Sequence, residues 1–85
     1  MKIICVGRNY SEHAKELNNP LPETPLIFLK PDTALVRENK DIYYPEFTQD
    51  LHFECELVIR IAKGAKFVEP QHVDKVIDGI GLGID

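Results

Sequence analysis

The sequence predicts an α+β fold in which short strands alternate with short helices. Three observations favour this class: apolar runs rich in β-branched residues, one long stretch of strict two-residue alternation, and short segments of helical spacing between them. The chain has 85 residues, of which 44% are hydrophobic and 28% are charged. This is the composition of a globular protein, and the length allows at most one small domain.

Several segments are expected to be strands. The strongest is "HFECELVIRIA", because its odd-numbered positions are all apolar while most of its even-numbered positions are charged or polar. The final "GIGLGID" also alternates, with glycine at every second position, so one face of that strand would be bare backbone. The expected strands cover residues 2–7, 26–30, 33–38, 41–45, 52–62 and 79–85, the third and fourth being joined by the polar turn "ENKD".

Two segments are expected to be helices. Residues 9–17 begin with Asn9 as a possible N-cap, and Glu12 follows three residues later, which resembles a capping box. Residues 69–80 have Pro70 near their start and Gly79 as a possible C-cap.

Composition and charge exclude several classes of function. The net charge is −4, and Lys and Arg do not cluster, so the sequence predicts no nucleic-acid partner. No apolar run reaches the length of a membrane helix and no signal peptide is recognisable, so we expect no membrane partner and a cytoplasmic location. Cys5 and Cys55 lie far apart in apolar runs and are expected to be reduced, buried thiols.

Glu54 and Glu56 are the first candidate site. Side chains at positions i and i+2 of a strand leave the same face, so these two like charges would stand side by side. One interpretation is the exposed polar face of an amphipathic strand, which His52 and Arg60 would share. The other is a metal site: carboxylates without imidazole or thiolate partners suit Mg²⁺, Mn²⁺ or Ca²⁺ rather than zinc. Asp85 is a candidate third ligand.

His13 and Glu16 are the second candidate site. At helical spacing i and i+3 they share a face, so Glu16 could orient His13 as a general base. A plain surface pair on a short helix is the alternative interpretation. Just before them, "GRNY" is a strand-to-helix turn whose backbone N–H groups could bind an anion, with Arg8 adding positive charge. A simple glycine turn fits these residues as well.

Taken together, these motifs resemble the fumarylacetoacetate hydrolase family, in particular its acylpyruvase-like and oxaloacetate-decarboxylase-like members. The resemblance runs through "KIICVGRNYSEHAKEL", "PLIFLKP", "LHFECEL" and "GIGLGID" in order. It implies the first part of a mixed β-roll with short helices, so residues 1–85 would be the N-terminal part of a single catalytic domain that stops at Asp85. A catalytic lysine and the second half of the roll, expected further along, are absent.

The resemblance also implies chemistry. Glu54, Glu56 and Asp85 would bind one Mg²⁺ or Mn²⁺ (Ca²⁺ being a further possibility), and His13 with Glu16 would form a catalytic dyad. Arg8, Asn9 and Tyr10 would shape the substrate pocket. The implied function is metal-dependent C–C cleavage of a small 2-oxo acid, such as an acylpyruvate or oxaloacetate, by a homodimer. Two alternatives stay open: an isomerase or hydratase of hydroxylated dienoates, and a fragment that is inactive as it stands.

Overall fold

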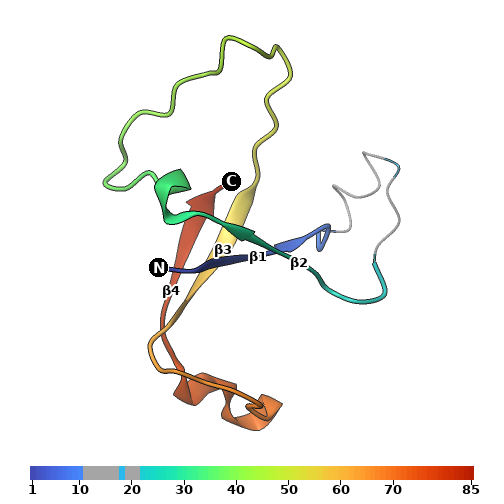
Figure 1. The fold of residues 1–85 in the computed structure, drawn as a ribbon, viewed down its shortest axis with the longest axis vertical. Helices are drawn as coiled ribbons and strands as arrows, with labels where there is room; N and C mark the ends of the chain where they lie inside the picture. The colour runs from blue at the N-terminus through green and yellow to red at the C-terminus, as the bar shows by residue number, and fades with distance from the viewer. Residues whose placement is uncertain (11–17, 19–21) are drawn as a thin grey trace. The chain divides into compact units, whose positions relative to one another are not determined.

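The computed structural model describes residues 1–10, 18 and 22–85. The chain divides into two compact units, Met1–Tyr43 and Tyr44–Asp85, and each is described by itself. The predicted helix over residues 9–17 falls mostly outside the described residues. Each unit contains one antiparallel pair of strands, which Figure 1 shows as β1 with β2 and β3 with β4. This strand-rich arrangement with short helices agrees with the predicted α+β class.

The first unit is built on strands β1 (Ile3–Gly7) and β2 (Leu26–Lys30). Both are rich in branched apolar residues, which suit the pleated backbone. The register pairs Ile3 with Lys30 and Gly7 with Leu26. Pro31 follows β2 at once and has no N–H to donate, so the strand ends there. Both strands were predicted within one or two residues.

The strands expected over residues 33–38 and 41–45 are not formed, which corrects the sequence prediction. The short 3₁₀ helix η1 (Asp32–Ala34) follows β2 instead. Beyond it, Glu38 and Asn39 both have a positive φ, 62° and 52°, and the Lys40 N–H donates to the Arg37 carbonyl. Two consecutive left-handed residues are typical of a hairpin turn. The polar turn was therefore predicted correctly, but its two arms do not pair as strands.

The second unit is built on strands β3 (Cys55–Ile61) and β4 (Ile77–Ile84). Their antiparallel register pairs Cys55 with Ile84 and Arg60 with Gly79. The alternation in the sequence explains the two faces of this pair. One face carries most of the apolar residues of both strands, and the other carries Glu56, Val58 and Arg60 of β3 opposite the glycines of β4.

The helix predicted over residues 69–80 is shorter than expected. A 3₁₀ helix, η2, covers Pro70–Lys75, and β4 begins at Ile77. Gly79 therefore lies inside a strand and does not cap a helix, which corrects that prediction. Val76 still belongs to the end of η2, because its N–H donates to the Val73 carbonyl. The β-branched Ile77 favours strand and pairs with Ile61 of β3.

The described residues do not bury a core of their own. None of their side chains is fully buried, and the apolar face of β3 and β4 is largely exposed: Leu57 by 60% and Leu82 by 78%. Cys5 and Cys55 are both thiols, as predicted, but neither is buried: Cys5 is half-buried, and Cys55 is exposed because it belongs to this face. In the described part of the chain no helix has the length and apolar character needed to cross a bilayer.

Candidate metal centre

Glu54 and Glu56 lie at the start of β3, on the face opposite its apolar residues. Both are half-buried, whereas Phe53 and Leu57, which alternate with them, are 74% and 60% exposed. The interpretation of an exposed polar strand face would expect the reverse. The two glutamates are thus more protected than the apolar residues next to them, whereas Val58 and Arg60 further along the same face are exposed.

Asp85 lies directly opposite Glu54. The Glu54 N–H donates to the Asp85 carbonyl at 2.8 Å, and the Asp85 N–H donates to the Glu54 carbonyl at 2.9 Å. Figure 1 shows this arrangement, with β4 reaching the C-terminus beside the start of β3. Residues that exchange both backbone hydrogen bonds project their side chains from the same face, with Cβ atoms about 5 Å apart. The register therefore brings all three acidic residues predicted as ligands to one end of one face.

The strand opposite Glu56 contributes almost no side-chain volume to this face. Glu56 pairs with Gly83, and Val58 pairs with Gly81. A Cβ added at Gly81 would meet no atom within 4 Å, whereas one at Gly83 would lie 3.1 Å from the Val58 side chain. The open space on this face therefore lies at Gly81, opposite Val58, while the Val58 side chain lies close to Gly83, opposite Glu56.

The chemistry of these three residues fits a hard cation. All three donors are carboxylates, and oxygen-only sites suit Mg²⁺, Mn²⁺ or Ca²⁺. In the part of the chain that the structure describes, no three His, Cys, Asp or Glu side chains converge into a group that would hold an ion. Like charges at facing positions repel, so rotamers that bring them together are favourable only around a cation. The backbone register places the three acidic residues at one end of one face. That their carboxylates converge around an ion stays a prediction.

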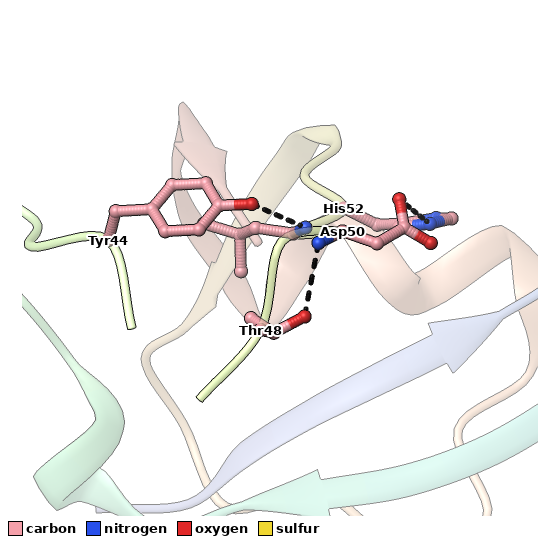
Figure 2. A network of polar contacts seen from close by, with 5 residues as sticks. Tyr44, Thr48, Asp50 and His52 are labelled. Atoms are coloured by element: carbon pink, nitrogen blue, oxygen red, sulfur yellow. Dashed lines mark hydrogen bonds and ion pairs between the residues drawn. The ribbon is translucent and has the colours of Figure 1, made fainter. Parts of the chain in front are cut away.

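A hydrogen-bonded loop leads into the acidic end of β3 (Figure 2). The Leu51 N–H donates to the Tyr44 hydroxyl at 3.2 Å, and the Asp50 N–H donates to the Thr48 hydroxyl at 3.1 Å. The His52 Nε2 atom lies 3.1 Å from Asp50 Oδ1. These contacts hold the backbone three and four residues before Glu54, and they were not expected from the sequence.

An ion pair lies at the other end of the same face. Arg60 Nε donates to Asp78 Oδ1 at 2.6 Å, and its Nη2 donates to Oδ2 at 3.1 Å, which is a bidentate arrangement. These hydrogen bonds hold the pKa of the Asp78 carboxyl below its ordinary value and raise the pKa of Arg60. Arg60 was read in the sequence only as part of a polar face. Its partner could not be found, because Asp78 was assigned to a helix.

The remaining predicted site residues belong to the first unit. Arg8, Asn9 and Tyr10 follow β1 directly, and all three are exposed. Arg8 has a φ of 55°, an uncommon conformation for a residue other than glycine, and it turns the chain at the end of the strand. His13 and Glu16, the predicted dyad, lie outside the described residues.

The family model described as fumarylacetoacetate (FAA) hydrolase C-terminal matches residues 2–85, which is nearly the whole chain. The chain belongs to the fumarylacetoacetate hydrolase family. This membership confirms the resemblance drawn from the sequence motifs.

Relatives in this family support the assignment. Oxaloacetate tautomerase YcgM of Escherichia coli is 37% identical over 99% of this chain. The mitochondrial oxaloacetate tautomerase FAHD1 of Arabidopsis thaliana is 40% identical over the same share. A crystal structure of a putative fumarylacetoacetate isomerase/hydrolase from Oleispira antarctica matches 99% of this chain with a TM-score of 0.89 and 44% identity. In all three cases the chain spans 38% of the relative's length.

Proposed function

We propose that this chain supplies the divalent-cation site of an enzyme that acts on small 2-oxo acids. The observation that carries the proposal is the β3–β4 register, in which Asp85 faces Glu54 and Glu56 follows on the same face. Family membership supports it, and so do the names of relatives that act on oxaloacetate, a 2-oxo acid.

Each predicted site residue has a role in this proposal. Glu54, Glu56 and Asp85 hold Mg²⁺ or Mn²⁺, which when bound supplies a Lewis acid for the oxygens of the substrate. In a hydrolytic reaction His13, oriented by Glu16, accepts a proton from the attacking water at an imidazole nitrogen. A guanidinium such as that of Arg8 can bind a carboxylate through two hydrogen bonds, and Asn9 and Tyr10 complete the pocket mouth.

The reaction proposed from the sequence is C–C bond cleavage, either hydrolysis of an acylpyruvate or decarboxylation of oxaloacetate. Keto–enol tautomerisation of oxaloacetate is a second candidate, which the names of the E. coli and A. thaliana relatives favour. Both reactions develop negative charge on the keto oxygen of the substrate, so the same electrostatic stabilisation serves both. They differ in the bond that breaks: a C–C bond in cleavage, a C–H bond in tautomerisation.

The cation site is tested by Mn²⁺ titration of the 85-residue polypeptide, followed by electron paramagnetic resonance. We expect the double variant Glu54→Gln/Glu56→Gln to lose more than about 100-fold in Mn²⁺ affinity, because loss of ligands should exceed the 10–100-fold cost of losing outer-shell partners. Asp74→Asn is a control for charge alone, since it removes one negative charge, half the change in the double variant, from η2 outside this face. Unchanged affinity in the double variant would remove the metal site from the proposal.

The reaction is tested in a polypeptide that contains residues 1–85 together with the further length found in the relatives. We expect Mg²⁺- or Mn²⁺-dependent conversion of oxaloacetate, and Glu54→Gln should lower it at least about 100-fold, as for the loss of a metal ligand. Pyruvate release measures decarboxylation, and loss of enol absorbance without pyruvate measures tautomerisation. Residues 1–85 alone are expected to bind the ion without turnover. The homodimer and the cytoplasmic location stay predictions, and sedimentation velocity checks the first.

A further inference from the structure

Strand β4 has a sequence that does not define its own register against β3. Glycine and an apolar residue alternate from Gly79 to Ile84, so sliding β4 by two residues keeps glycines on one face and apolar side chains on the other. The antiparallel hydrogen-bond pattern also repeats every two residues, so it is preserved as well. Glycine-rich strands are prone to such slippage.

A two-residue slip in one direction shows this degeneracy. Leu57 would pair with Ile84 instead of Leu82, and Ile59 with Leu82 instead of Ile80, so every new pair on the apolar face would again be apolar. The connection between the strands does not select the register either. It covers residues 62–76 and includes η2, so it is no tight turn that dictates which residues face each other.

The register nevertheless has a side-chain contact that a slip would destroy. Arg60 pairs with Gly79, but Ile61 pairs with Ile77, so Asp78 is the extra residue of a β-bulge. The bulge lets the Asp78 carboxylate turn to Arg60, whose guanidinium donates two hydrogen bonds to its oxygens, at 2.6 and 3.1 Å. The Arg60 side chain lies across Gly79, where an added Cβ would be 3.5 Å from its Nε atom. A shift of two residues would carry Asp78 about 7 Å from Arg60.

We infer that the bidentate Arg60–Asp78 pair at the bulge locks the β3–β4 register, and thereby positions Asp85 opposite Glu54. Exposed ion pairs add little to the stability of a protein. Here a small contribution is enough, because the registers differ little in the free energy of backbone pairing and apolar packing, and the ion pair has only to favour one of them. Arg60 and Asp78 are positioning residues in this inference, since they act on the acidic end of the strands through the backbone.

Slippage would change the acidic cluster in either direction. In one slipped register Asp85 faces Glu56 instead of Glu54, and in the other it faces His52 and is separated from Glu56 by several residues. Only this consequence for a bound cation rests on the function proposed above. The register itself can be measured without any metal.

The test is nuclear magnetic resonance on the 85-residue polypeptide, which reads the register from contacts between Hα atoms. Glu54 and Asp85 form a hydrogen-bonded pair, and such pairs alternate along the strands with non-hydrogen-bonded ones. Leu57 and Leu82, three positions further along, are therefore a non-hydrogen-bonded pair, in which the two Hα atoms lie close together. In Arg60→Gln and in Asp78→Asn we expect this contact to weaken and a Leu57–Ile84 or Leu57–Ile80 contact to emerge. Arg60→Lys, which keeps the charge, should retain the native contact. Lys63→Gln, a change of the same charge in the loop after β3, should have no effect.

Three results would overturn the inference. The first is an unchanged Leu57–Leu82 contact in both Arg60→Gln and Asp78→Asn, whatever the metal affinity. The second is loss of every cross-strand contact in these variants, because the pair would then act on stability and not on register. The third is an equal shift of register in Lys63→Gln.

Mn²⁺ titration of the same variants gives the functional readout. If the wild type binds Mn²⁺, a shifted register should weaken binding about 10-fold or more, as for loss of an outer-shell partner. If the wild type binds no Mn²⁺, the metal site proposed above fails while the Hα contacts still decide the register lock. A shifted register with undiminished Mn²⁺ affinity would overturn the positioning role.

Discussion

At the scale of single residues, the charged groups of the second unit differ in how their surroundings hold them. Glu54 and Asp85 are placed by backbone hydrogen bonds to each other, which act regardless of what the side chains are. Arg60 and Asp78 are placed by their side chains, through two charge-assisted hydrogen bonds. Substitutions of Glu54 or Asp85 should therefore change the metal-binding groups without moving the backbone. Substitutions of Arg60 or Asp78 should change the register of the strands.

The depressed pKa of Asp78 predicts an acid-sensitive register. A carboxyl whose folded pKa is lowered stabilises the folded arrangement above its ordinary pKa of 3.8, and this contribution is lost as the pH falls through the folded value. We therefore expect the Leu57–Leu82 contact to persist at pH 5 and to weaken only below 3.8, as the pair loses its negative partner. The measurement is an acid titration in which nuclear magnetic resonance follows the amide chemical shifts of Gly79 and Ile80.

Asp78→Asn is the control for this titration, because it has no carboxyl at that position. Its amide shifts at Gly79 and Ile80 should lack the acid step of the wild type. An identical step in Asp78→Asn would show that the transition does not arise from Asp78.

At the scale of elements, strand β4 has two different faces, one apolar and one made of glycines. Its apolar residues provide one face, and its glycines form the other, with open space at Gly81 and the Val58 side chain close to Gly83. Glycine in a strand weakens it, because the unfolded chain has more freedom to lose. The glycine face of β4 is thus obtained at a cost in strand stability.

Two glycine substitutions distinguish the effect of unfolded-state entropy from the effect of the space available for a methyl group. Gly81→Ala meets no atom within 4 Å, so it should stabilise the fold by about 0.4–1 kcal/mol through the unfolded state. Gly83→Ala gains the same entropy, but its methyl group would lie 3.1 Å from Val58 and requires that side chain to move. We expect it to be less stable than Gly81→Ala by about 1 kcal/mol, the lower end of overpacking effects.

Urea unfolding followed by circular dichroism measures both variants. Equal stability would show that Val58 adjusts without cost. Because Gly83 faces Glu56, Gly83→Ala should also weaken Mn²⁺ binding more than Gly81→Ala does, provided that the wild type binds the ion.

At the scale of the whole molecule, the main property is apolar surface that the described residues do not cover. On β3 and β4 alone, Leu57, Ile80, Leu82 and Ile84 are each at least 60% exposed. Contiguous apolar patches of this kind mark surfaces that other polypeptide covers or that associate. The chain also spans only 38% of the length of the relatives described above.

This surface predicts dye binding by the 85-residue polypeptide. We expect it to bind the fluorescent dye 8-anilinonaphthalene-1-sulfonate under native conditions, because such dyes bind exposed apolar surface. Leu82→Gln should reduce the fluorescence while changing the free energy of unfolding by no more than about 0.5 kcal/mol, as is usual for exposed positions. Fluorescence no greater than that of the dye alone would contradict this description of the apolar face.

The strands show how far local sequence is informative. Two-residue alternation predicted β3 and the glycine-apolar face of β4, and branched apolar runs predicted β1 and β2. The strands expected around Glu38 and Asn39 failed because alternation describes a face but does not provide a partner strand. The helix expected over 69–80 failed because pairing with β3 outweighed helical spacing from Ile77 onward.

For this protein, the sequence by itself determined the family, the turn positions, the strongest strands and the acidic residues that share a face, because these depend on local periodicity and on motifs close together in the chain. Only the tertiary structure decided that Asp85 faces Glu54, that Gly79 lies in a strand, and that Asp78 meets Arg60. These depend on the register between two segments separated by residues 62–76. A repeating glycine-apolar pattern is compatible with more than one register, so the choice requires contacts that span both strands.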